Sequence, residues 1–176
     1  RAVIFAGNHP SGLLDPLVLM AALPHKELTS VAKQSLFAMP FVGFFLAQMR
    51  AVPVAKAADP DLPPEAQASP EQRRAMNRAM FDTARARLLD ERVNLCIFPE
   101  GTCHSSHEIK ELKTGTARIA LEVASAAPSS RVPIIPVGLS YSQPSGRTFR
   151  GSVLVDFGRP VNVTDELLRL FESSEE

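Results

Sequence analysis

The sequence predicts an α/β domain with a mostly parallel central sheet covered by helices. Short apolar runs, typical of buried strands, alternate along the chain with longer segments of helical character. Polar side chains directly follow three of these runs, at His9, Lys56 and Glu100. Because parallel strands end at the same edge of a sheet, we expect these three residues to gather there.

Length and composition limit the function classes. The 176 residues are enough for one domain with a substantial core, and we expect residues 1–176 to form a single domain. A formal net charge of zero argues against a nucleic-acid binder. The two cysteines do not make a disulfide framework, and no apolar run reaches the length of a membrane span. Because the chain begins at Arg1, we expect it to be an excerpt of a longer protein.

The first strand is expected at residues 2–6, and a polar turn follows it. Pro10 and Gly12 make a continuous helix unfavourable there, so His9 should lie in a turn and Asp15 at the start of the next helix. Asp15 followed by Pro16 fits an N-cap with a proline at the first helical position. A second, compatible interpretation is that Asp15 accepts a hydrogen bond from His9 and makes it a better general base.

The next segments predict two strands and an apolar helix. Residues 28–32 resemble a strand, and residues 37–49 carry apolar side chains on nearly every side, which favours a buried helix. The alternative is a surface that dips into a bilayer or lines an acyl-chain groove. A short strand at residues 51–54 contains a proline that indicates an edge or an irregular position in the sheet, and Lys56 follows it. Residues 57–69 are expected to be a flexible surface excursion.

A long helix is expected to begin after Ser69, which has the character of an N-cap followed by proline and an acidic residue. It should run to about Asp90. Its apolar residues recur every four positions and predict a buried stripe made of Met76, Met80, Ala84 and Leu88.

The following buried strand, residues 93–98, leads into Pro99, Glu100 and Gly101. Glu100 is too polar to be buried unpaired, so we expect it to meet a partner or a ligand hydroxyl. Gly101 allows the backbone to approach a ligand closely.

The remainder of the chain predicts a helix, two strands and a last helix. The helix opens around residues 112–116, where Lys113 and free backbone N–H groups would form an anion site. Strands are expected at residues 131–138 and 152–160, and a final helix after Thr164.

A zinc site and a serine hydrolase are two alternative chemistries for these residues. Cys103, His104 and His107 have the ligand types of a zinc site, but no second close pair completes a tetrahedron. Ser11 or Ser105 beside a histidine could serve a hydrolase, but neither serine stands in a Gly-x-Ser-x-Gly elbow.

Four segments in order between residues 3 and 161 resemble the motifs of the PlsC-like glycerolipid acyltransferases. Asn8-His9 and Asp15-Pro16 resemble the first motif, with the five intervening residues of a bacterial and fungal branch, where most members have four. Phe98 to Thr102 resembles the third motif residue for residue. Residues 51–56 and 131–138 resemble the second and fourth. Lys56 departs from the usual arginine of the second motif, and Cys103 stands where many members have arginine.

The resemblance implies transfer of a fatty acyl group from acyl-CoA to glycerol-3-phosphate or 1-acylglycerol-3-phosphate. His9 and Asp15 would be catalytic. The residues implied for the acceptor site are Lys56, Glu100, Gly101, Thr102 and Lys113. The resemblance further implies acyl-CoA as co-substrate with no resident cofactor, and a membrane surface as partner. The expected location is the cytosolic face of the endoplasmic reticulum in a eukaryote or of the inner membrane in a bacterium. A lipid esterase and a non-catalytic lipid-binding domain are the alternatives.

Overall fold

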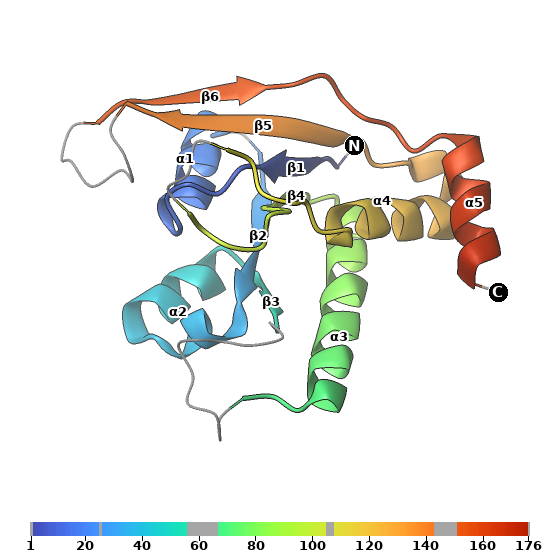
Figure 1. The fold of residues 1–176 in the computed structure, drawn as a ribbon, viewed down its shortest axis with the longest axis horizontal. Coiled ribbons are helices and arrows are strands. Elements are labelled where there is room, and N and C mark those ends of the chain that lie inside the picture. The colour runs from blue at the N-terminus through green and yellow to red at the C-terminus, as the bar shows by residue number, and fades with distance from the viewer. Residues whose placement is uncertain (1, 25, 56–66, 105–107, 143–150, 176) are drawn as a thin grey trace.

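The computed structural model describes residues 2–24, 26–55, 67–104, 108–142 and 151–175 (Figure 1). The described strands are β1 (Ile4–Gly7), β2 (Leu28–Lys33), β3 (Val52–Val54), β4 (Asn94–Ile97), β5 (Ile134–Tyr141) and β6 (Val153–Phe157). The described α-helices are α1 (Leu14–Ala22), α2 (Pro40–Gln48), α3 (Pro70–Leu89), α4 (Gly115–Ala126) and α5 (Asp165–Glu175), with short 3₁₀ helices η1 (Gln34–Ala38) and η3 (Pro128–Ser130).

The strands form one six-stranded sheet in the order β3-β2-β4-β1-β5-β6. All neighbouring pairs are parallel except β5 and β6, which are antiparallel. This confirms the predicted α/β fold with a mostly parallel sheet. The sheet places β1 between β4 and β5, with Ile4 opposite both Leu95 and Ile134. The short strand with Pro53 lies at the edge, as its proline predicted.

Apolar side chains are buried on both faces of the sheet. Successive residues of a strand point to opposite faces, and β1 shows this directly. Ile4 belongs to a core with residues of α3, α4 and α5, such as Ala84 and Ile119. Phe5 belongs to a second core with Leu19 of α1. Helices therefore cover both faces, and the strand ends are left for polar residues.

Helix α3 follows the sequence prediction closely. The Ser69 side chain accepts from the backbone N–H of Gln72, whose side chain accepts from the backbone N–H of Ser69, so the helix begins with a capping box. Of the predicted stripe, Met80, Ala84 and Leu88 are buried and Met76 is half-buried.

The prediction of one buried helix over residues 37–49 is wrong in two respects. The segment divides into η1 and α2, because Pro40 has no N–H and starts a new helix at its first position. The two parts pack tightly, since a Cβ on Gly43 would lie 2.2 Å from the carbonyl oxygen of Phe37. Only Gly43 and Leu46 of α2 are buried, whereas Phe41 is 90% and Phe44 is 69% exposed.

The later elements extend or confirm their predictions. Strand β5 runs three residues farther than expected, to Tyr141, which brings its end to the sheet edge discussed below. The final helix follows Thr164, whose hydroxyl oxygen accepts from the backbone N–H of Leu167 at 3.3 Å. Most of the predicted excursion, and Lys56 with it, lies outside the described residues, so its flexibility stays a prediction. No helix in the described part of the chain is long and apolar enough to cross a membrane.

Candidate active site

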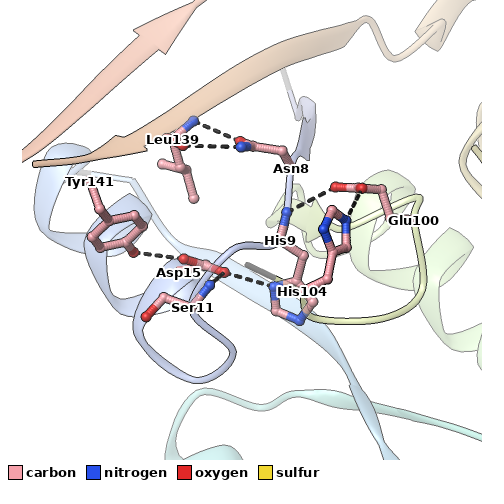
Figure 2. Close-up of polar contacts among 8 residues, drawn as sticks. All are labelled: Asn8, His9, Ser11, Asp15, Glu100, His104, Leu139 and Tyr141. Carbon is pink, nitrogen blue, oxygen red and sulfur yellow. Dashed lines mark hydrogen bonds and ion pairs between the residues drawn. The ribbon is translucent and has the colours of Figure 1, made fainter. Parts of the chain in front are cut away.

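The site lies where β1, β4 and β5 end, at one edge of the sheet. His9 follows β1, Glu100 follows β4, and Tyr141 is the last residue of β5. Because these strands are parallel neighbours, their carboxyl ends bring the three residues together (Figure 2). The expected meeting of His9 and Glu100 is therefore confirmed. Lys56, expected at the same edge, lies outside the described residues.

His9 and Asp15 form a hydrogen-bonded pair. Nδ1 of His9 lies 2.8 Å from Oδ2 of Asp15, whose side chain is wholly buried, while the His9 side chain is 20% exposed. Since the carboxylate accepts, Nδ1 is assigned the proton and Nε2 is left as the acceptor. The ring of Phe98 stacks on the imidazole, with centroids 4.2 Å apart and planes at 12°. These contacts hold His9 in the orientation and tautomer of a general base.

Asp15 is not the N-cap that the sequence predicted. Helix α1 begins at Leu14, with Leu13 in the cap position, so Asp15 is the second helical residue and Pro16 the third. The carboxylate is committed elsewhere: besides His9, Oδ2 accepts from the backbone N–H of Ser11 at 2.8 Å. Pro16 fits the first turn because the N–H groups there have no partner within the helix.

Glu100 is buried and already satisfied by the protein. Its carboxylate accepts from the backbone N–H of His9 at 3.1 Å, from the backbone N–H of Lys110 at 2.8 Å, and from Nε2 of His104. Burial would raise the pKa of Glu100, but these donors outweigh burial and hold it below its usual range. The predicted partner therefore exists within the protein, whereas contact with the acceptor stays a prediction.

The backbone of His9 is held at its N–H and at its carbonyl by the loop after β4. Glu100 accepts from the His9 N–H, and the backbone N–H of His104 donates to the His9 carbonyl at 3.1 Å. Nδ1 of His104 is buried and has no hydrogen-bond partner among the described residues. A cavity of about 20 Å³, enough for one water-sized group, lies beside these side chains. It is lined by Asn8, His9, Pro10, Glu100, His104, Glu108 and Ile109.

Gly101 and Lys113 lie against each other in the segment between β4 and α4. Gly101 has a φ of +67°, and a Cβ there would lie 2.8 Å from Nζ of Lys113. The backbone N–H of Lys113 donates to the carbonyl of Pro99 at 2.8 Å, which anchors the lysine beside the strand end. Lys113 is exposed two residues before α4, and Thr102 is exposed in the same loop as Gly101. The lysine therefore has the predicted position near a helix N-terminus.

Residues 1–140 match the Acyltransferase family. The chain belongs to this acyltransferase family. The match covers most of the chain and includes every motif residue from Asn8 to Lys113, and it confirms the resemblance noted in the sequence.

Curated relatives of this acyltransferase chain match a shorter stretch. This chain is 33% identical over 79 residues to an uncharacterized acyltransferase of Schizosaccharomyces pombe. The match covers 45% of this chain and 11% of that protein. The chain is 35% identical over 79 residues to glycerol-3-phosphate O-acyltransferase 1 of Saccharomyces cerevisiae, covering 45% of this chain and 10% of the relative. The matched stretch thus spans about a tenth of each relative.

A solved structure resembles the acyltransferase chain over nearly its whole length. The crystal structure of the 1-acyl-sn-glycerophosphate (LPA) acyltransferase PlsC from Thermotoga maritima superposes with a TM-score of 0.59 at 23% identity. The match covers 99% of this chain and 63% of the PlsC chain. This likeness supports the fold described above.

Sequence reasoning missed Tyr141 as a residue of the acyltransferase site. Its hydroxyl donates to Oδ1 of Asp15 at 2.6 Å. A signal was present: Tyr141 is the only tyrosine of the chain, and it continues the alternation of Val137 and Leu139 on one face of the predicted strand. The role of Asn8 was also missed, and it is described below.

The sequence left a zinc site and a serine hydrolase as alternative chemistries. Among the described residues, no three His, Cys, Asp or Glu side chains gather as metal ligands, and His107 lies outside them. The backbone of Ser11 donates to Asp15. Ser105, the other serine considered as a nucleophile, also lies outside the described residues.

Proposed function

We propose that this acyltransferase domain moves a fatty acyl group from acyl-CoA to a hydroxyl of glycerol-3-phosphate or 1-acylglycerol-3-phosphate, as in phospholipid and triacylglycerol biosynthesis. The single observation that carries the proposal is the His9–Asp15 pair, which leaves Nε2 of a half-buried imidazole as a proton acceptor at the sheet edge. The similarity to a glycerol-3-phosphate O-acyltransferase of Saccharomyces cerevisiae and to an LPA acyltransferase of Thermotoga maritima supports this choice of acceptors.

The proposed reaction needs no covalent enzyme intermediate. Nε2 of His9 takes the proton of the acceptor hydroxyl, and the acceptor oxygen forms a bond to the thioester carbonyl carbon. The carbon–sulfur bond then breaks, and the departing CoA thiolate takes the proton from the imidazolium. Asp15 stabilises the imidazolium that forms during the step, because its Oδ2 faces the protonated Nδ1 at 2.8 Å.

The acceptor phosphate is proposed to lie near Lys113. The ammonium group of Lys113 is next to Gly101, and α4 begins two residues after Lys113. The charge of the lysine and the N–H groups at the helix N-terminus favour an anion there. We also propose Lys56 and Thr102 as acceptor-site residues. Glu100 supports this site indirectly, since it holds the His9 backbone.

The domain is proposed to work at a membrane surface on the cytosolic side, at the endoplasmic reticulum in a eukaryote or the inner membrane in a bacterium. Its products would be amphiphilic, and the η1–α2 segment offers an apolar surface. The exposed apolar side chains of this segment are Met39, Phe41, Phe44 and Phe45. Exposed aromatic side chains favour contact with the acyl–headgroup boundary of a bilayer.

A product assay tests the proposed function. Purified protein is given acyl-CoA with glycerol-3-phosphate, 1-acylglycerol-3-phosphate, dihydroxyacetone phosphate or no acceptor, and free thiol and acylated product are measured. Thiol released only with an acceptor, together with the acylated product, supports the transferase. Fatty acid released from a glycerolipid instead indicates the esterase, and neither signal indicates a lipid-binding domain.

His9→Ala provides the matched control for this assay. The loss of a general base should lower turnover by about 10²- to 10⁴-fold. The fold should survive, because His9 lies in a turn at the edge of the sheet. Near-normal turnover in a folded His9→Ala protein would exclude the mechanism even if the product is correct.

A further inference from the structure

The two oxygens of the Asp15 carboxylate are held by different parts of the fold. Oδ2 accepts from His9 and Ser11, both in the turn after β1. Oδ1 accepts from the hydroxyl of Tyr141 at the far end of β5, at 2.6 Å (Figure 2). The mechanism proposed above uses only Oδ2, so the contact of Tyr141 with Oδ1 has no role in it.

The register of β5 carries Tyr141 to this position. The ladder between β1 and β5 ends with Gly7 opposite Val137, where the main chain turns away toward His9. The side chain of Asn8 then continues the pairing: its Nδ2 donates to the Leu139 carbonyl at 3.0 Å, and its Oδ1 accepts from the Leu139 N–H at 2.7 Å. Tyr141 lies two residues beyond Leu139 and therefore points to the same face.

The hydroxyl of Tyr141 is suited to be a permanent donor. Burial and the neighbouring Asp15 carboxylate raise the pKa of Tyr141, so it keeps its proton. Two thiols of the described residues also interact with this tyrosine–carboxylate pair. Cys96 lies in β4, where burial and then Asp15 raise its pKa, and Cys103 in the following loop also raises the pKa of Tyr141. The Cys96 thiol therefore keeps its proton and does not compete for the proton of the tyrosine.

We propose that Tyr141 is a positioning residue for the His9–Asp15 pair. Its hydroxyl prevents rotation of the Asp15 carboxylate, which keeps Oδ2 on Nδ1 of His9, and it takes up part of the carboxylate charge. With that charge reduced, Asp15 favours the imidazolium less strongly than a carboxylate without the tyrosine hydroxyl would. The kinetic meaning of this inference rests on the proposed function, whereas the effect on His9 itself does not.

Tyr141→Phe tests the inference, because it removes the hydroxyl and keeps the ring. Ser140→Ala is the matched control, since Ser140 is the neighbouring exposed residue on the opposite face of β5. A hydrogen bond to a charged group supports a loss on the order of 10-fold in kcat, with the KM for either substrate little changed. The acid limb of the kcat/KM profile should move to higher pH in Tyr141→Phe and stay in place in Ser140→Ala.

A substrate-free measurement separates this inference from the proposed function. The chain has four histidines, and NMR of ¹⁵N-histidine-labelled protein can follow each of them, with His9→Gln assigning the His9 signals. The titration midpoint of His9 should be higher in Tyr141→Phe than in the wild type and unchanged in Ser140→Ala. An unchanged His9 titration in folded Tyr141→Phe overturns the inference, even if kcat falls, because that fall would reflect structural damage alone. A shifted titration in a protein without transferase activity supports the positioning role and rejects the proposed function.

Discussion

At the scale of single residues, the site depends on carboxylates that are buried and fully used by the protein. Asp15 accepts from two other residues besides His9, and Glu100 accepts from two backbone N–H groups and a histidine ring. The residue types of the motif indicated that Glu100 would need a partner. Which partner it meets depends on how the loops fold back onto β4, and no local pattern in the sequence encodes that.

Glu100→Gln should destabilise the fold at neutral pH. A carboxamide cannot accept all of the hydrogen bonds that reach both carboxylate oxygens, so at least one buried N–H group loses its partner. An unsatisfied buried donor costs about 1–3 kcal/mol of the free energy of unfolding. Urea unfolding measures the difference, and Glu111→Gln, an exposed carboxylate near the same loop, is the control and should change little.

The stabilisation that Glu100 contributes should also depend on pH. The folded-state pKa of Glu100 is lowered from 4.5, so its stabilisation is present above the unfolded pKa and is lost as pH falls through the folded one. The difference in the free energy of unfolding between wild type and Glu100→Gln should stay constant from about pH 7 to about pH 5 and become smaller below about pH 5. A difference that already becomes smaller above pH 5 would contradict the lowered pKa.

Lys113→Met should weaken recognition of a phosphorylated acceptor. A charge-assisted hydrogen bond is worth about 1.5–3 kcal/mol, so kcat/KM for glycerol-3-phosphate should fall about 10- to 150-fold. Plain glycerol, which has no phosphate, should be affected much less. Lys26→Met is the matched control, because Lys26 precedes β2 and so lies at the opposite edge of the parallel sheet. Equal losses on both acceptors would mean that Lys113 does not bind the phosphate.

At the scale of elements, the sequence predicted burial most accurately for elements that have one clearly apolar face. Helix α3 has a clear cap and a stripe of period four, and both were found. Helix α2 is apolar all round, so its sequence could not tell which side faces the sheet or whether every side is covered. Tyr141 was missed because its importance comes from the pairing of β5 with β1, a contact between residues more than 130 positions apart.

The exposed face of α2 predicts membrane binding by this element. Phe41→Ser combined with Phe44→Ser should reduce flotation with anionic liposomes several-fold and leave the melting temperature nearly unchanged, because both side chains are mostly exposed. The matched control combines Leu154→Ser with Leu170→Ser, which removes exposed apolar side chains from β6 and α5. Equal flotation of the two double variants would exclude α2 as the contact surface.

At the scale of the whole molecule, the centre of the sheet and the base of the site coincide. β1 and β4 are inner strands, and the buried residues around them include Ile4, Leu95 and Cys96. β3 is an edge strand, and α2 buries only a small part of its surface. Local stability should therefore be highest beneath His9 and Glu100 and lowest around the apolar helix.

Amide hydrogen exchange followed by mass spectrometry should reveal this gradient. Peptides that cover β1 and β4 should exchange slowest, and those that cover α2 and β3 should exchange earlier under the same conditions. The physical reason is that opening an inner strand breaks two ladders, whereas an edge strand opens by breaking one. Slower exchange in β3 than in β4 would contradict the assigned strand order.

The residues of the candidate site come from both parts of the chain that flank residues 56–66. The earlier part supplies β1, β2 and β3 with His9 and Asp15, and the later part supplies β4, β5 and β6 with Glu100, Lys113 and Tyr141. In the sheet these contributions interleave, because β4 inserts between β2 and β1. Neither part alone contains the His9–Asp15 pair together with Tyr141 and Lys113. The geometry of the candidate site is therefore complete only when β4 of the later part lies between β2 and β1 of the earlier part.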